Sequence, residues 1–343
     1  MSVPPHLLVG PLPLAERPDY VLVIPSFNRP VMLRERTLQI LLQQGIDLTR
    51  VFVFVANCVA PGQSVTEREC YVAMLSELGF PAENVVVGVR GIREQRNFMV
   101  KWVLERYDEL KHVVSMDDDL EKLEYKVRTG FDNNGGERGL LRQLEVGGLE
   151  AWIAHAAKGM QMHEAYIWSA NTSNNVYFMR SDVISTCNGM CNGYLYGFLA
   201  RGDADLLPQF KDATEDRERS VRYFAKDGIQ LRYKMYSAKT KCFKNTGGLQ
   251  DLFEGKNLKQ KNEARKFEEH TGHMMIENAF PTLYTQQSVR PRKDMQTMEG
   301  GFHSVSSRHT LDGVPVSSGL GCDLKPRRRG GGGAETKRRR IRT

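Results

Sequence analysis

Three consecutive carboxylates, Asp117, Asp118 and Asp119, follow the short apolar run His112–Met116. The run contains adjacent β-branched residues and is typical of a buried strand. Three anions in a row repel one another, and a divalent cation would offset that repulsion. Carboxylate oxygens suit Mg²⁺ or Mn²⁺, which often bridge to substrate phosphates. The motif therefore predicts a metal site at the carboxyl end of a strand, with a solvated acidic turn as the alternative.

Three other groups of polar residues stand where they could join the acidic triplet. Each also has a simpler explanation: the residues after the first strand could form a plain turn, Arg96 could be a charge on a helix surface, and Glu215 with Asp216 could be carboxylates that favour the first turn of a helix. The amide and guanidinium groups of the Gln95–Asn97 group can reach a base, a ribose or a phosphate, and a helix N-terminus favours anions. In chain order the groups are Pro25, Ser26, Asn28 and Arg29 after the first strand, Gln95, Arg96 and Asn97 at a helix start, and Glu215 with Asp216 at another.

Strands and helices are predicted to alternate through the first 120 residues. This alternation, with short connections, predicts an α/β sheet with right-handed crossovers. The chain has neither a GxGxxG turn after its first strand nor a GxxxxGK(S/T) loop, which argues against a dehydrogenase and a P-loop enzyme. Short apolar runs predict strands at 20–26, 50–56, 85–89 and 112–116, and helices are predicted at 32–42, 64–78 and 93–107.

The second half of the chain predicts fewer regular elements. Residues 121–148 are charged and glycine-rich and are expected to form a mobile loop. From Gly272 to about Asp323 we expect irregular structure. The predicted elements are a helix at 149–162, a half-buried strand lining a cleft at 167–184, an apolar segment at 194–199, and a helix that begins near Glu215–Asp216, ends at Gly228 and is followed by a strand.

Four motifs, taken together, resemble one family. IPSFNRP, VGVRGIREQRN, VVSMDDDL and TEDRERSVRYFAKDG, which lie between residues 20 and 230, look like the motifs of a GT-A fold glycosyltransferase. They are most similar to the TET-associated glycosyltransferases, which include the base J DNA glucosyltransferase and act on hydroxymethylpyrimidines in DNA. The resemblance implies a GT-A type nucleotide-sugar-binding sandwich around a mixed, mostly parallel sheet, followed by an irregular C-terminal extension.

The resemblance also implies a role for each matched residue. Asp117 would hold the ribose or the sugar, and Asp118 and Asp119 would face a Mn²⁺ or Mg²⁺ ion that bridges the phosphates of the donor, UDP-glucose. Asp216, with Glu215 beside it, would supply the general base. The nucleotide pocket would be formed by Pro25, Ser26, Asn28, Arg29, Gln95, Arg96 and Asn97. A further metal ligand often comes from the C-terminal region, and the candidates are His273, His303 and His309.

The expected reaction combines this resemblance with general chemistry. A divalent cation neutralises the departing UDP, and a carboxylate takes the proton of the acceptor hydroxyl as attack develops. The expected function is a metal-dependent, inverting transfer of glucose from UDP-glucose to the hydroxymethyl group of 5-hydroxymethyluracil or 5-hydroxymethylcytosine in DNA, with the base flipped out of a duplex. The alternatives are a GT-A glycosyltransferase acting on a glycan, lipid or protein, and a non-catalytic DNA-binding scaffold of the GT-A type.

A basic stretch bears on the choice of acceptor. Nine cations between residues 217 and 244 could form a phosphate-tracking face with stacking aromatic residues. The alternative is an amphipathic helix and strand with solvated cations and core aromatic residues. The cations are Arg217, Arg219, Arg222, Lys226, Arg232, Lys234, Lys239, Lys241 and Lys244, and the aromatic residues are Tyr223, Phe224, Tyr233 and Tyr236.

Charge is unevenly distributed along the 343 residues. Of the formal net charge of +7, residues 325–343 contribute nine Lys and Arg against one acid, a net +8, which leaves −1 for the rest. This glycine-rich basic tail suits attraction to nucleic acid or nuclear import, with a solubilising terminus as the alternative. No apolar run approaches the roughly 20 residues of a membrane span, and the N-terminus makes a poor signal peptide. An intracellular protein is expected, nuclear if eukaryotic and in the host cytoplasm if viral.

We expect the chain to be divided into a leader, a glycosyltransferase domain, an extension and a tail. The glycosyltransferase domain has a nucleotide-binding half and an acceptor-binding half. The expected boundaries are a proline-rich leader at 1–18, the GT-A domain at 19–255 with halves at 19–120 and 121–255, a C-terminal extension at 256–324, and a basic disordered tail at 325–343.

Overall fold

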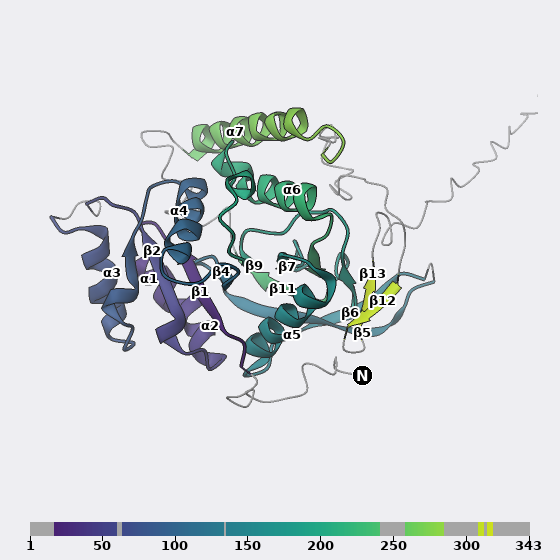
Figure 1. The fold of residues 1–343 in the computed structure, drawn as a ribbon. Coiled ribbons are helices and arrows are strands. Elements are labelled where there is room, and N and C mark those ends of the chain that lie inside the picture. The colour runs from purple at the N-terminus through teal and green to yellow at the C-terminus, as the bar shows by residue number, and fades with distance from the viewer. Residues whose placement is uncertain are drawn as a thin grey trace, which may run out of the picture.

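One ten-stranded sheet organises the chain, and helices cover both of its faces (Figure 1). The computed structural model describes residues 17–59, 64–133, 135–240 and 258–284, and the backbone of two more short strands. Across the sheet the strands are β12 (Arg308–Leu311), β13 (Val314–Ser317), β8 (Ile184–Ser185), β10 (Leu231–Tyr233), β7 (Ile167–Ala170), β9 (Leu195–Leu199), β4 (His112–Met116), β1 (Tyr20–Pro25), β2 (Val51–Val55) and β3 (Val85–Val87).

The first half of the sheet has the predicted alternation of strand and helix. β4, β1, β2 and β3 are neighbours and run parallel, so their carboxyl ends share one edge. The predicted helix at 32–42 is two short helices that meet at Arg36. The helices are α1 (Pro30–Glu35), α2 (Thr37–Gln43), α3 (Glu67–Ser76) and α4 (Ile92–Leu104), with 3-10 turns η3 (Leu48–Arg50) and η4 (Ala82–Asn84).

The second half makes the sheet mixed. β9 runs antiparallel to both β4 and β7, whereas β7 and β10 are parallel. The mixed, mainly parallel α/β architecture predicted from the sequence is therefore confirmed. The predicted helix that ends at Gly228 is also confirmed, and this glycine has φ +68°. The elements here are α5 (Gly148–His163), η5 (Ala204–Leu206), η6 (Asp212–Thr214) and α6 (Glu215–Asp227).

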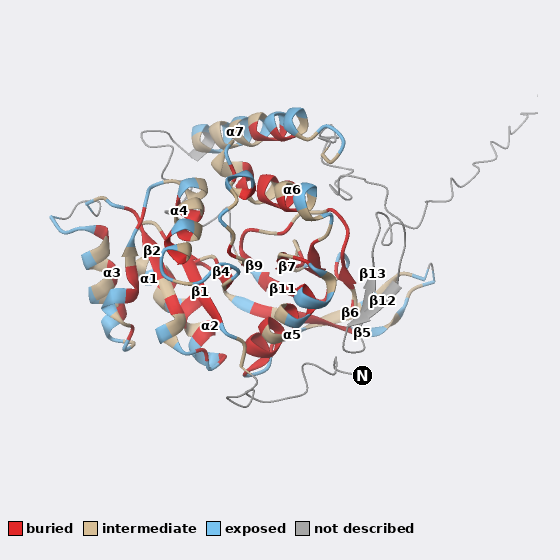
Figure 2. Ribbon diagram, in the orientation of Figure 1, coloured by how far each residue is buried: buried red, intermediate tan, exposed pale blue. Residues whose placement is uncertain are grey.

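Two apolar clusters lie on opposite sides of the sheet and fix the helices to it (Figure 2). One packs α2, α3 and α5 around residues such as Leu22, Tyr71 and Trp152. The other packs α4 and α6 around Trp102 and Tyr223. Strands buried on both faces are apolar throughout, which is why the burial of β1 and β4 is continuous.

Two regions differ from the prediction. Residues 121–148 do not form a mobile loop throughout: β5 (Lys122–Phe131) and β6 (Glu137–Gln143) pair as a long hairpin, and β11 (Tyr236–Lys239) pairs with β5 in a second sheet. Helix α7 (Leu258–Ala279) was not predicted, and it extends past Gly272, where irregular structure was expected. Gly272 packs on Thr214 at the start of α6.

Some predictions cannot be placed on this fold. Most of the proline-rich leader, the basic tail, Lys241, Lys244 and His303 lie outside the described residues, as does the side chain of His309. Within the described ranges, no helix is both long enough and apolar enough to cross a membrane.

Candidate functional site

The acidic triplet follows β4 and lies between the ends of β1 and β9. The residues Asp118 and Asp119 are only 4% and 5% exposed, whereas the side chain of Asp117 is 34% exposed. Thr37 fixes the turn, because its hydroxyl donates to the Asp117 carbonyl at 2.8 Å and accepts from the Leu120 amide at 3.0 Å. A solvated acidic turn is therefore excluded.

Asp118 and Asp119 share one cation from the chain itself. Arg29 Nη1 lies 3.1 Å from Asp118 Oδ1 and 3.6 Å from Asp119 Oδ2. Ser26 Oγ donates to Asp118 Oδ2 at 2.5 Å, and the Tyr71 hydroxyl lies 2.6 Å from that Oγ and accepts from the Arg29 amide. Desolvation raises the pKa of Asp118, and Arg29 opposes the rise. The surroundings of Asp118 and Asp119 therefore stabilise a positive charge close to both carboxylates.

Arg96 connects the triplet to the predicted base. Its Nη2 donates to Asp117 Oδ1 and to the Gly193 carbonyl, both at 2.7 Å, and its Nη1 pairs with Glu215 Oε1. Gly193 must be small, because an added Cβ would lie 2.6 Å from Arg96 Nη1. Desolvation raises the pKa of Asp117, and Arg96 opposes the rise. Residues 98 positions apart in the chain, Asp117 and Glu215, are thereby held on one guanidinium.

Glu215 and Asp216 have different surroundings. Glu215 is 4% exposed, and its second oxygen accepts from Arg219 Nη1 at 2.7 Å, so both of its oxygens are engaged by arginines. Asp216 is half-buried and accepts from the backbone amides of Arg217 at 2.8 Å and Gly193 at 3.4 Å. Of the pair, Asp216 is the carboxylate with room to accept another proton donor.

The first-strand loop is held by a residue that the sequence did not single out for this site. Pro25 ends β1, and Asn28 has φ +54° with its amide donating to Glu67 Oε1 at 2.6 Å. Glu67 also accepts from the Ala56 amide at 3.1 Å, so one buried carboxylate ties the ends of β1 and β2 together. Glu67 is free for this role because the N-terminus of α3 is closed by a capping box of Thr66 and Glu69.

The three polar residues at the start of α4 do different things. Gln95 is buried and accepts from the Val89 amide at 2.7 Å, so it braces the turn between β3 and α4. Asn97 Nδ2 donates to the Pro208 carbonyl at 2.8 Å. Only Arg96 of the three contacts the acidic triplet.

Two carboxylates of the described residues, those of Asp118 and Asp119, could supply part of the coordination shell of a divalent ion. His273 is buried against the Tyr284 hydroxyl and lies 3.7 Å from Glu269. Among the described residues, no three His, Cys, Asp or Glu side chains are grouped to hold a metal. Mg²⁺ and Mn²⁺ sites commonly use one or two carboxylates, with phosphate and water completing the shell. Asp118 and Asp119, with Thr240 Oγ1 donating to Asp119 at 2.9 Å, match that pattern.

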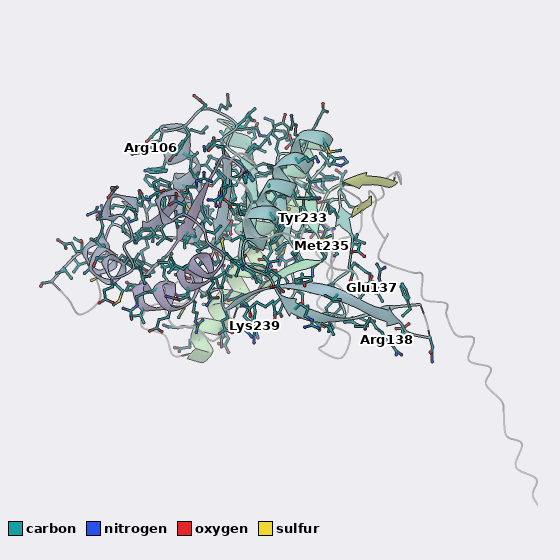
Figure 3. All side chains as sticks on the ribbon, turned by 90° about the horizontal axis from the view of Figure 1, so that it is seen from below. Arg106, Glu137, Arg138, Tyr233, Met235 and Lys239 are labelled. Atoms are coloured by element: carbon teal, nitrogen blue, oxygen red, sulfur yellow. The ribbon has the colours of Figure 1, made fainter. Side chains whose placement is uncertain are left out.

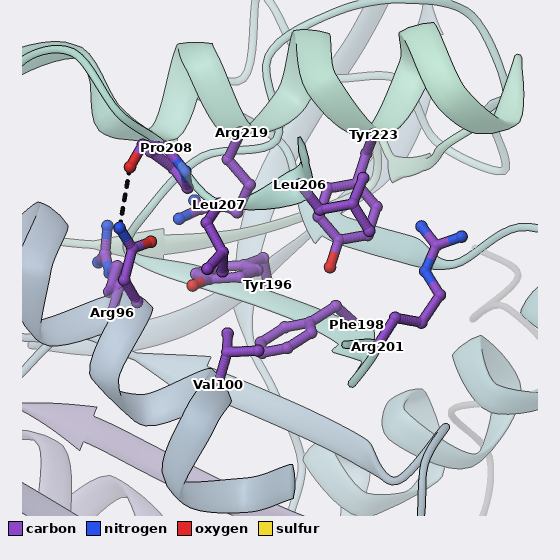
Figure 4. A pocket seen from close by; sticks show the side chains of 11 residues that line it. Arg96, Val100, Tyr196, Phe198, Arg201, Leu206, Leu207, Pro208, Arg219 and Tyr223 are labelled. Carbon is purple, nitrogen blue, oxygen red and sulfur yellow. Dashed lines mark hydrogen bonds between the residues drawn. The ribbon is translucent and has the colours of Figure 1, made fainter. Parts of the chain in front are cut away.

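A small pocket lies behind Arg96, between α4, β9 and α6 (Figure 4). Its volume is about 20 Å³, room for one water molecule. Arg219 stacks on Tyr196 there, 3.7 Å from the ring centroid, and its Nε and Nη2 are buried without a hydrogen-bond partner among the described residues. The pocket is too small for a nucleotide and instead surrounds the arginines that hold Glu215.

Several cations of the predicted phosphate-tracking face lie inside the fold. Arg219, Arg232 and Lys234 are at most 6% exposed, and Arg222 pairs with Glu218 at 2.7 Å. That prediction is wrong for these cations, which pack inside the fold rather than facing solvent. The aromatic residues Tyr223, Tyr233 and Tyr236 are buried, so their alternative assignment to the core is confirmed.

No protein-family model and no curated protein matches the chain. Among solved structures it is similar to Staphylococcus aureus TarS residues 1–349, alone and with UDP-GlcNAc, at 12% identity and TM-score 0.37 over 78% of this chain and 76% of that one. It is also similar to the mannosyltransferase PcManGT from Pyrobaculum calidifontis with GDP-Man and Mn²⁺, at 13% identity and TM-score 0.37 over 79% and 77%. Likenesses this distant carry no conclusion about fold or activity.

Proposed function

We propose that the chain is a metal-dependent, inverting glycosyltransferase that moves glucose from UDP-glucose to the hydroxymethyl group of a modified pyrimidine in DNA. The observation that supports this most is the bridge through Arg96, which joins Asp117 to Glu215 and so brings the acidic triplet beside the half-buried Asp216. Ser26 and Arg29 of the first-strand loop contact Asp118, so the four motifs that resemble those of a nucleotide-sugar enzyme lie together near the carboxyl end of β4. Ligands of α/β folds commonly bind at such strand ends.

The acidic triplet would bind the donor. A divalent ion on Asp118 and Asp119 would supply positive charge to the diphosphate. Arg29 already faces both carboxylates and would turn toward the nucleotide when they hold a cation, because guanidinium groups bind phosphate oxygens well. The exposed part of Asp117 would accept a hydroxyl of the ribose or the sugar.

Asp216 would take the proton of the acceptor. Its half-buried carboxylate accepts from the backbone amides of Arg217 and Gly193, whereas Glu215 is engaged by Arg96 and Arg219. The acceptor oxygen would attack the anomeric carbon as the bond to UDP breaks, with the proton passing to Asp216, so a single displacement inverts the anomeric centre.

The acceptor rests on the resemblance of the motifs and on the basic tail. A DNA acceptor would place the protein in the nucleus of a eukaryote or in the host cytoplasm for a virus. An enzyme acting on a glycan, lipid or protein would use the same donor chemistry with a different acceptor. A non-catalytic scaffold would bind DNA without transferring a sugar.

Incubation with UDP-[¹⁴C]glucose and Mn²⁺ tests the proposal, with hydroxymethyluracil DNA, hydroxymethylcytosine DNA and unmodified DNA as acceptors. We expect label in modified DNA only, and none with Asp216→Asn. Mass spectrometry of the nucleosides identifies the sugar and the base. Label that enters a glycan, lipid or protein instead would refute the DNA acceptor, and absence of both transfer and Mn²⁺-dependent UDP binding would refute the enzyme.

A further inference from the structure

Helix α7 lies along the outer edge of the molecule, beside α6 (Figure 1). One face of α7 is anchored to the body. Gly272, His273 and Ile276 are buried on that face, and an added Cβ on Gly272 would collide with the Thr214 hydroxyl at the start of α6. This close packing holds α7 in place as a ridge about 33 Å long, the length of 22 residues at the rise of a helix.

The opposite face of α7 exposes apolar side chains. Phe267 is 73% exposed, the largest fraction of any large apolar side chain in the described ranges, and Met274 is 48% exposed. These two residues are seven positions, or about two turns, apart, so they lie on the same side of the helix. Large apolar side chains gathered on one exposed face commonly mark a surface that another molecule covers.

Charge is ordered along α7 in the opposite sense to its dipole. Residues 258–266 carry four Lys and Arg against one acid, a net +3, and residues 267–279 carry three acids and no Lys or Arg, a net −3. A helix dipole favours acids in the first turn and cations in the last, and α7 has neither. This order does not stabilise α7 by itself, but it suits an antiparallel neighbour that has the same order.

Two of these charges flank the exposed face. Lys266 is exposed and Glu277 is half-buried. They are eleven positions, or about three turns, apart, so they share one flank of the helix. Neither side chain forms a hydrogen bond or an ion pair with another of the described residues. Both are therefore available to a partner molecule.

We propose that two copies of the chain pair through α7 as an antiparallel, two-fold symmetric dimer. Both copies then use the same surface, so each contact occurs twice. With the axis midway between residues 266 and 277, Lys266 of each copy faces the partner's Glu277. Phe267 fits between the partner's Met274 and Asn278, as a knob fits between residues of a facing helix. The pairing is independent of the function proposed above.

The dimer is expected to be weak. One helix from each copy makes a small contact, and the exposed Glu263 adds an acid close to the partner's Glu277. Sedimentation equilibrium of the full chain should show the mass rising from one copy towards two over roughly 1–300 µM, the range of a small and transient interface.

The apolar contact is tested by Phe267→Ser, which should keep the chain monomeric throughout this range. The matched control is Phe131→Ser, which removes a phenylalanine that is 61% exposed on the hairpin of β5 and β6. That hairpin projects from the body of the molecule, and the control should dimerise as the wild type does (Figure 3). Urea unfolding should give the same free energy for both variants and the wild type, because both side chains are exposed.

The antiparallel arrangement is tested by charge reversal. Lys266→Glu and Glu277→Lys should each weaken dimerisation about tenfold, because each replaces two attractions by two repulsions. The variant with both substitutions should recover the affinity of the wild type. The two side chains are about three turns apart within one copy, so neither substitution could correct a purely structural effect of the other.

Three results would overturn this dimer. The first is a wild-type chain that remains monomeric across the whole range. The second is a dimer that Phe267→Ser leaves intact, which would place the interface elsewhere on the molecule. The third is a doubly reversed variant that associates no better than the single variants, which would exclude the antiparallel pairing of Lys266 with Glu277.

Discussion

Replacing Arg29 with methionine would leave Asp118 and Asp119 without the cation they share. At an effective dielectric constant of about 20, each contact at 3.1 and 3.6 Å represents an attraction of roughly 5 kcal/mol, most of which repays desolvation. Removing one partner of a buried ion pair costs about 3–5 kcal/mol, because the remaining charge is left uncompensated. We expect Arg29→Met to lower the free energy of unfolding by an amount in that range without metal.

Mn²⁺ should restore much of this loss, because the ion supplies the missing positive charge and the two carboxylates no longer face a competing guanidinium. Urea unfolding with and without Mn²⁺ measures both effects. The matched control is Arg34→Met, whose pair with the exposed Glu77 at 2.9 Å is worth no more than about 1 kcal/mol. A variant that loses no stability, or that Mn²⁺ stabilises no more than it stabilises the wild type, would refute the placement of the cation between Asp118 and Asp119.

Three further predictions concern the base, the core and the tail. Glu215→Gln should lower the free energy of unfolding by about 3–5 kcal/mol, because it removes the charge that pairs with two buried arginines. Asp216→Asn should abolish transfer and leave the free energy of unfolding unchanged. If transfer kinetics and urea unfolding give the reverse pattern, the roles of the two residues are exchanged. Burial lowers the pKa of His112 from 6.5 in the unfolded chain to about 4. The contribution of the neutral imidazole to the free energy of unfolding is therefore complete above pH 6.5 and declines as the pH falls towards 4, by about 2 kcal/mol at pH 5. His112→Asn should remove this decline from urea unfolding curves measured at pH 7 and pH 5, and a decline that persists in the variant would belong to other groups. Deleting residues 325–343 should weaken DNA binding and reduce its salt dependence while sparing UDP binding; an unchanged salt slope would make the tail a targeting or solubilising segment.

The parts of the fold that depend on neighbouring residues in the chain could be predicted from the sequence. β4 is an apolar run that stops at three acids, and α6 ends at a glycine in the left-handed conformation. The hairpin of β5 and β6 also had a local signal, since Leu123, Tyr125 and Val127 alternate with polar residues, but the glycines of residues 130–136 favoured a loop. Helix α7 is polar around much of its circumference and therefore lacks the apolar stripe that identifies a helix.

The support of the site could not be predicted, because it consists of contacts between residues distant in the chain. Thr37 fixes the acidic turn from 80 positions away, and Thr240 reaches Asp119 from 121 positions away. A threonine has no pattern that distinguishes this use from any other. The burial of Arg219 and Arg232 could not be predicted for the same reason, because the sequence gives their charge and only the packing shows where their side chains lie.

The hydroxyl of Thr240 joins Asp119 to the end of β11, which pairs with β5 in the second sheet. A donor that reorients this carboxylate would have to break that hydrogen bond or shift the end of β11. Thermodynamic linkage then requires reciprocity: whatever factor a change in the second sheet imposes on the affinity for the donor, bound donor imposes on that change. A single side-chain hydroxyl therefore offers a route by which occupancy of the acidic site can be coupled to the second sheet.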